Sequence, residues 1–144
     1  MSPDVIFQSA NLAALLGWAA LVVSPWIPVW SQRVAAYLVP GLLSIAYVGL
    51  IFAFWSAADG GFGSLDDVAT LFETRELLLA GWLHFLAFDL FVGAWIVRDA
   101  RRRSLSFLLA LLCLPLAFLF GPAGLLAWLF IRFVAALRTA PGAA

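Results

Sequence analysis

Residues 75–100 read RELLLAGWLHFLAFDLFVGAWIVRDA, in which charged residues bound an apolar run over 77–97. A helix of about 20 predominantly apolar residues is long enough to cross the hydrocarbon core of a bilayer. This run therefore predicts a transmembrane helix. Nothing in the chain shows the period-two alternation of apolar and polar residues that a membrane β-barrel requires.

Three further runs of the sequence are apolar and long enough to cross a bilayer. Together with the first they cover residues 5–26, 34–56, 77–97 and 105–137. Prolines separate the first two, since Pro25 and Pro28 end one run and Pro40 lies near the start of the next. The chain is therefore predicted to be an all-α integral membrane protein, in which residues 1–144 form a single domain of four transmembrane helices.

The last of these runs is too long for one simple crossing. As a single helix it would extend about 50 Å, against a hydrocarbon core of about 30 Å. Pro115 and the segment FGPAG at 120–124 interrupt it. We expect a long, strongly tilted helix that is kinked at these prolines and glycines, or a spanning helix followed by a surface helix.

Composition excludes several classes of protein. Hydrophobic residues make up 65% of the 144 and charged residues 11%, with a mean hydropathy of +1.07. Soluble domains are about 45–50% apolar and about 25% charged, so a soluble enzyme, a nucleic-acid-binding module and a disordered chain are excluded. Cys113 and His84 are each alone, which excludes an internal disulfide and a His-rich di-metal site within one chain. We expect no metal and no cofactor.

The arginines predict an orientation. One side of the membrane carries an arginine-rich set in the first and third connections, Arg33, Arg98, Arg101, Arg102 and Arg103. The other side carries only Arg75 and Arg138, so the arginine-rich side is predicted to be cytoplasmic and both termini to face outward. The N-terminus has no basic region, which favours a retained first helix over a cleaved signal peptide. We expect the inner membrane of a bacterium.

The connection over 57–76 is the one sizeable loop of this scheme. Ser64 followed by Asp67 resembles a helix-capping box, and Val68, Leu71 and Phe72 fall on one helical face. The pattern predicts a short amphipathic helix. It could lie on the membrane surface or form a lid over a pocket between the spans.

Two ionisable residues lie near the middle of the third span. Burial of such groups in a membrane is costly, so Asp89 and His84 each call for an explanation. They point about 140° apart on a helix, so both cannot face one narrow pocket. Asp89 shares a stripe with Trp82 and Phe85. Each residue serves either in acid–base chemistry or as a hydrogen-bonded tie within the helix bundle.

Further polar and aromatic residues define a hypothetical pocket. Under the predicted orientation the outward half of the membrane holds Gln8, Asn11, Arg75, Glu76, His84 and Arg132. They either converge on one pocket or lie among the headgroups, where Arg132 would snorkel. Tyr47 adds a hydroxyl near the middle of the second span. A slot for a long flat ligand, or alternatively core packing, is indicated by Trp18, Trp82, Phe85, Phe88 and Phe91.

Three segments carry a resemblance to a known family. They are NLAALLGWAALVVSP at 11–25, WLHFLAFDLFVG at 82–93 and FGPAGLL at 120–126. With them the whole chain resembles the abscisic-acid-deficient-four-like membrane family. The resemblance implies a small four-helix membrane protein. Its plant members lie in plastid membranes and are needed to make neoxanthin from violaxanthin, an isomerisation that opens an epoxide.

Three functional hypotheses follow. The first is an isomerase-type enzyme acting on a membrane-dissolved carotenoid, xanthophyll or other isoprenoid. Its candidate acid and base residues are Asp89, His84 and Glu76, and its candidate substrate-binding residues are Asn11, Tyr47, Trp18, Trp82, Phe85, Phe88 and Arg132. The second is a non-catalytic carotenoid- or lipid-binding or scaffold protein, and the third a small proton-linked transporter using Asp89. The expected partners are membrane lipids, a carotenoid ligand and a second copy of the chain, without nucleic acid.

Overall fold

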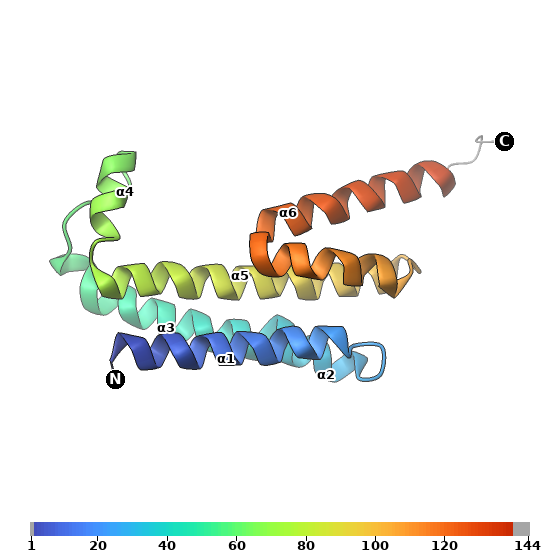
Figure 1. Cartoon of the computed structure of the whole chain (residues 1–144), viewed down its shortest axis with the longest axis horizontal. Helices are drawn as coiled ribbons and strands as arrows, with labels where there is room; N and C mark the ends of the chain where they lie inside the picture. The colour runs from blue at the N-terminus through green and yellow to red at the C-terminus, as the bar shows by residue number, and fades with distance from the viewer. Residues whose placement is uncertain (1, 140–144) are drawn as a thin grey trace.

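A computed structural model describes residues 2–139, and within them the chain is helical with no β-strand (Figure 1). The sequence prediction of an all-helical protein is confirmed. In chain order the elements are α1 (Pro3–Val22), α2 (Pro28–Gln32), the π-helical segment η1 (Arg33–Leu38), α3 (Val39–Phe54), the 3₁₀ turn η2 (Trp55–Ala57), α4 (Leu65–Leu71), α5 (Arg75–Arg102) and α6 (Phe107–Thr139).

Four helical stretches are long and apolar enough to cross a membrane by length and composition. They are Pro3–Val22, Pro28–Ala57, Arg75–Arg102 and Phe107–Arg138. The second of them joins α2, η1, α3 and η2 into one continuous run. These stretches are compatible with an integral membrane protein and match the four apolar runs of the sequence.

Helix α5 is the centre of the bundle. It packs against α1, α3 and α6, and a larger share of it is buried than of any other spanning stretch. Small residues allow the close packing, because a Cβ atom on Gly17 of α1 would overlap Leu90, and one on Gly93 would overlap the ring of Trp18. Residues 75–102 thus form the helix against which α1, α3 and α6 pack.

Helix α6 reverses direction at its middle. The backbone of Phe120 leaves the helical conformation, with φ −143° and ψ 53°, directly before Gly121 and Pro122. Figure 1 shows the first half of α6 lying along α5 and the second half turning back beside it. The turn needs a glycine at 124, because a Cβ atom there would overlap the backbone of Ala117.

The reversal corrects two predictions from the sequence. The second half of α6 runs in the same direction as α5, because Gly121 lies against Asp89 while Arg132 lies against Asp99. Arg132 therefore does not lie in the half of the bundle that holds Asn11 and Glu76. Figure 1 also places the ends of the described chain at opposite ends of the bundle, which removes the basis for predicting both termini on one side.

The connection between α3 and α5 contains the short helix that the sequence predicts. Ser64 precedes α4, and its hydroxyl accepts a hydrogen bond from the backbone N–H of Asp67 at 3.1 Å. Gly60 has a φ of +91°, a conformation that glycine adopts without steric cost. Leu71 at the end of α4 is buried, whereas Phe72 remains partly exposed beside the start of α5.

Candidate functional site

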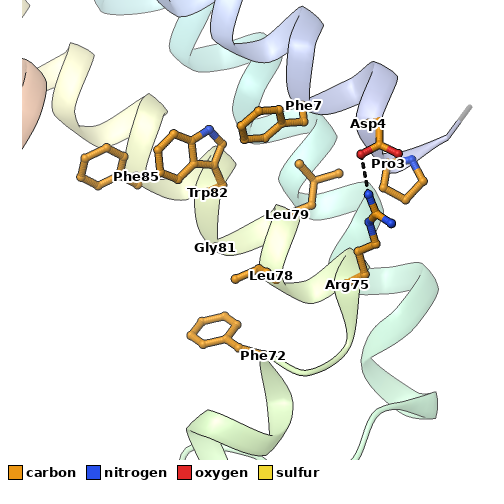
Figure 2. Close-up of a pocket in the computed structure, with 10 residues that line it drawn as sticks. All are labelled: Pro3, Asp4, Phe7, Phe72, Arg75, Leu78, Leu79, Gly81, Trp82 and Phe85. Atoms are coloured by element: carbon orange, nitrogen blue, oxygen red, sulfur yellow. Dashed lines mark hydrogen bonds and ion pairs between the residues drawn. The ribbon is translucent and has the colours of Figure 1, made fainter.

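A pocket opens at the end of the bundle where α1 begins, between α1, α5 and the segment that follows α4 (Figure 2). Its volume is about 590 Å³. The residues that line it are mostly apolar, with one ion pair among them: Pro3, Asp4, Phe7, Phe72, Arg75, Leu78, Leu79, Gly81, Trp82 and Phe85. We call it the α1–α5 pocket.

Aromatic rings form much of its wall. Trp82 and Phe85 of α5 are stacked, with their centroids 5.3 Å apart, and Phe7 of α1 lies 5.7 Å from Trp82. Gly81 leaves room for Phe72, since a Cβ atom at that position would come within 3.1 Å of the Phe72 ring. The pocket thus presents a row of flat apolar faces, which suits an elongated planar hydrocarbon.

The other end of the pocket is polar. Arg75 at the start of α5 donates a hydrogen bond to Asp4 in the first turn of α1, and both side chains are about two-thirds exposed. Figure 2 shows this ion pair at one end of the row of residues and Phe85 at the other. An exposed ion pair contributes little to stability, so its carboxylate and guanidinium are free to exchange partners with a ligand.

Asn11 supports the pocket from α1 without lining it. Its side-chain amide donates to the carbonyl of Phe7 at 2.7 Å, and its Oδ1 accepts a hydrogen bond from the indole N–H of Trp82 at 3.2 Å. Both hydrogen bonds hold aromatic residues of the pocket wall. Asn11 is therefore a positioning residue for Phe7 and Trp82.

The reversal of α6 explains why the pocket is open. Figure 1 shows that α6 lies along only one half of α5, the half that leads to its C-terminus. The turn of α6 meets α5 at Asp89, so Phe85 and Trp82, which lie about one and about two helical turns earlier, are not covered by it. A fourth helix that crossed the whole membrane could have filled this space.

Asp89 ties α5 to the turn of α6. Its side chain is buried, with 7% of the residue exposed, and it accepts a hydrogen bond from the backbone N–H of Gly121. Gly121 begins the second half of α6, where helix N–H groups lack partners within the helix and the helix dipole favours a negative charge. A Cβ atom on Gly121 would overlap the carboxylate. Its Oδ2 atom has no hydrogen-bond partner within residues 2–139, and Asp89 does not line the α1–α5 pocket.

His84 lies on a different face of α5. Its exposed ring stacks on Phe88 with centroids 4.6 Å apart and lies 5.8 Å from the ring of Tyr47 on α3. The structure therefore brings together His84, Phe88 and Tyr47, but not His84 and Asp89, as the angle between them on the helix predicts. Glu76 is half-buried beside Arg75 and does not line the pocket.

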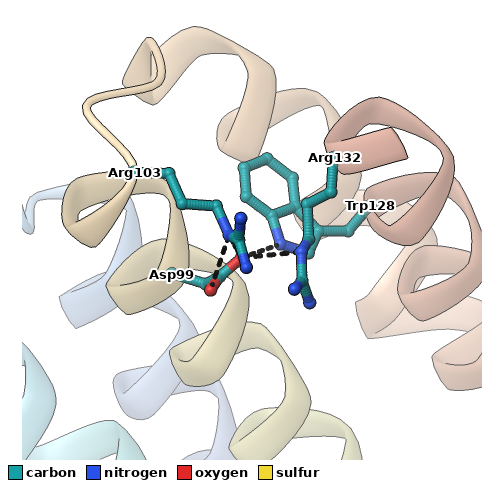
Figure 3. A network of polar contacts seen from close by, with 4 residues as sticks. All are labelled: Asp99, Arg103, Trp128 and Arg132. Carbon is teal, nitrogen blue, oxygen red and sulfur yellow. Dashed lines mark hydrogen bonds and ion pairs between the residues drawn. The ribbon is translucent and has the colours of Figure 1, made fainter. Parts of the chain in front are cut away.

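Two more candidates lie elsewhere in the bundle. Trp18 is buried against Gly93, with its ring edge-on to Phe118 at 5.5 Å, so it belongs to the core. Arg132 reaches Asp99 at the far end of α5 (Figure 3). Of the substrate-binding candidates, only Trp82 and Phe85 line the α1–α5 pocket directly.

At the polar end of the pocket, the sequence indicated Arg75 as a candidate pocket residue but not Asp4. Asp4 and Arg75 are 71 positions apart, and only the packing of α1 on α5 brings them together. The sequence does contain an indication that Phe7 belongs to the site, because Phe7 shares a helix face with the candidate residue Asn11 four positions later. Within residues 2–139 no three His, Cys, Asp or Glu side chains gather closely enough to hold a metal ion.

Comparison with known proteins identifies a family. The model of the ABA DEFICIENT 4-like family matches residues 5–128, which run from the first turn of α1 to a point beyond the turn of α6. No curated protein sequence matches the chain, and no solved structure matches it either.

Proposed function

Because the chain belongs to the ABA DEFICIENT 4-like family, we propose that it binds an elongated isoprenoid of the carotenoid or xanthophyll class and isomerises it by opening an epoxide. The observation that carries the proposal is the α1–α5 pocket, in which a row of aromatic rings ends at an exposed ion pair. An oxygenated carotenoid has the matching shape, with a long apolar chain and a polar ring at its end.

The position of the ligand follows from this match. The polyene lies against Trp82 and Phe85, whose rings offer flat apolar faces. The oxygenated end group meets Asp4 and Arg75 at the mouth of the pocket. Such a ligand reaches the pocket from the membrane, since the pocket lies beside two helices long and apolar enough to span it.

The reaction needs one group that stabilises the epoxide oxygen and one that accepts a proton. The guanidinium of Arg75 donates hydrogen bonds to the oxygen as the C–O bond breaks, while the carboxylate of Asp4 removes a proton from the neighbouring carbon. That proton then passes to the oxygen, so substrate and product have the same composition and no oxidant is consumed. Asp4 and Arg75 line the pocket, which favours them over the sequence candidates Asp89 and His84. Glu76, the next residue along α5, remains a candidate for relaying the proton.

Binding without turnover is the second candidate function. It is favoured by the exposure of the Asp4–Arg75 pair, because ionised groups in contact with water catalyse less effectively than groups in a water-excluded site. A carotenoid-binding protein of this kind would carry the pigment or present it to another enzyme.

The test is expression in a host that makes xanthophylls, followed by absorption spectroscopy and mass spectrometry of lipids extracted from the purified protein. We expect bound pigment, and about a tenfold loss of it in Trp82→Leu, given the contact area an indole provides. Trp26→Leu is the matched control, because Trp26 is 78% exposed and lies outside the pocket. Only bulk phospholipid in the wild-type extract would contradict both candidate functions.

Asp4→Asn separates the two functions. If the protein is an isomerase, this variant keeps the pigment but no longer converts an epoxy-xanthophyll supplied in vesicles to an isomer of equal mass. Isomer formation at the wild-type rate would remove Asp4 from the mechanism. Pigment bound by the wild-type protein without any isomer would establish the binding function alone.

A further inference from the structure

A second cavity lies at the opposite end of the bundle. Its volume is about 290 Å³, and its lining comes from the end of α5 and the second half of α6: Arg103, Leu129, Arg132, Phe133 and Ala136. The reversal of α6 creates this cavity, because it returns Arg132 to the end of the bundle where Arg103 lies. The site is separate from the α1–α5 pocket and does not depend on the function proposed for it.

The cavity carries an excess of positive charge. Figure 3 shows Arg103, Arg132 and Trp128 meeting at Asp99. The carboxylate accepts hydrogen bonds from Arg103 at 2.9 Å and from the indole N–H of Trp128 at 3.0 Å, and its distance to Arg132 is 3.3 Å. One carboxylate neutralises one of the two guanidiniums. The remaining positive charge is available to an anion.

The guanidinium of Arg132 is also held in place from its other side. It lies over the ring of Trp95, 5.4 Å from the centroid, and its side chain is 26% exposed. Arg103, with 42% of its side chain exposed, faces the same cavity from the end of α5. Two fixed guanidiniums from two helices form a fork that fits the oxygens of a phosphate group.

The rest of the cavity is apolar. Leu129 and Phe133 lie one turn apart on the second half of α6, and they are 43% and 61% exposed. A free phosphate ion would gain nothing from these side chains. A lipid would place its acyl chains on them while its phosphate meets the arginines.

We infer that this cavity binds the phosphodiester of an anionic phospholipid between Arg103 and Arg132, with the acyl chains along Leu129 and Phe133. Arg33, Arg101 and Arg102 lie at the same end of the chain's spanning stretches and add a positive field that attracts such lipids. Inorganic phosphate shares the headgroup chemistry but lacks the chains.

The test uses the full chain purified in a neutral detergent and titrated with short-chain phosphatidylglycerol, phosphatidylcholine or inorganic phosphate. Binding is read by native mass spectrometry. We expect phosphatidylglycerol to bind more tightly than phosphatidylcholine. We also expect Arg103→Gln to lower the affinity for phosphatidylglycerol by about fivefold, which is the effect of one arginine near an anionic lipid. Arg103→Gln leaves Asp99 with Trp128 and Arg132, so we expect the variant to fold.

Arg102→Gln is the matched control, because Arg102 is an exposed neighbour on the same helix end that does not line the cavity. An equal loss in Arg102→Gln and Arg103→Gln would overturn the site in favour of a diffuse surface charge. Inorganic phosphate binding as tightly as phosphatidylglycerol would overturn the lipid assignment. Phe133→Ser removes part of the apolar wall of the cavity and leaves its charges unchanged, so it should also weaken the binding of phosphatidylglycerol. Unchanged binding in this variant would contradict the proposal.

Discussion

The two halves of α5 each contain a long apolar stretch but have different surroundings. Its first half is left uncovered by α6 and borders the α1–α5 pocket, where an exposed ion pair meets a row of aromatic rings. Its second half is covered by the helical hairpin of α6, and there Asp99 is shared by two arginines and a tryptophan. One break in α6 therefore leaves the first half of α5 open beside the α1–α5 pocket and covers the second half.

The largest expected effect concerns the sidedness of the chain. With Cys113 replaced by alanine, single cysteines are introduced as Ser2→Cys and Arg138→Cys and labelled in sealed vesicles with a membrane-impermeant maleimide. Because α6 reverses, we expect the two positions to be labelled from opposite sides. Labelling of both from one side would mean that α6 crosses the membrane in a single pass.

Gly124→Leu should destroy the hairpin. The added side chain would overlap the backbone of Ala117, and backbone cannot move aside as a flexible side chain does. We expect loss of the folded protein, or a destabilisation of more than about 3 kcal/mol, measured by thermal unfolding in detergent. Gly49→Leu is the control, because a Cβ atom at Gly49 has no neighbour within 4 Å. Equal stability of the two variants would contradict the close approach at the turn.

Two variants of Asp89 distinguish a structural role of its carboxylate from a catalytic one. Asp89→Leu leaves the N–H of Gly121 without its partner, which should cost about 1–3 kcal/mol. Asp89→Asn keeps an acceptor oxygen, so we expect it to fold and to retain pigment binding and turnover. If Asp89→Asn folds but loses turnover, Asp89 takes part in the chemistry and the role we give to Asp4 is wrong.

The smallest effects compare the charged groups of the two ends. Arg75→Gln removes an exposed ion pair and should change stability by less than about 1 kcal/mol. Asp99→Asn leaves Arg103 and Arg132 without a counter-charge at a side chain that is only 14% exposed, so its cost should be larger, on the order of 2 kcal/mol. Both are measured by thermal unfolding under one set of conditions. The reverse ranking would mean that the open end, rather than the covered end, holds the bundle together.

Much of the local structure could be predicted from the sequence. The apolar runs give the spanning helices because a helix satisfies its own backbone within lipid. The pattern Ser64 and Asp67 gives the start of α4, and helical spacing gives the stripe of Trp82, Phe85 and Asp89. The same spacing predicts that His84 faces elsewhere, where it meets Phe88 and Tyr47.

The tertiary structure alone decided how α6 runs and therefore where the pocket lies. Glycine and proline permit a break at Phe120, but they do not fix its angle, which depends on Gly124 fitting against Ala117 and Gly121 against Asp89. An apolar run is equally compatible with the hydrocarbon core whether the helix continues or turns back. Hydrophobicity therefore carries no information on the direction of the second half of α6. For that reason the sequence identified Asp89 as a costly group within a span and Arg132 as a pocket or headgroup candidate, and only the packing of the helices decided their partners.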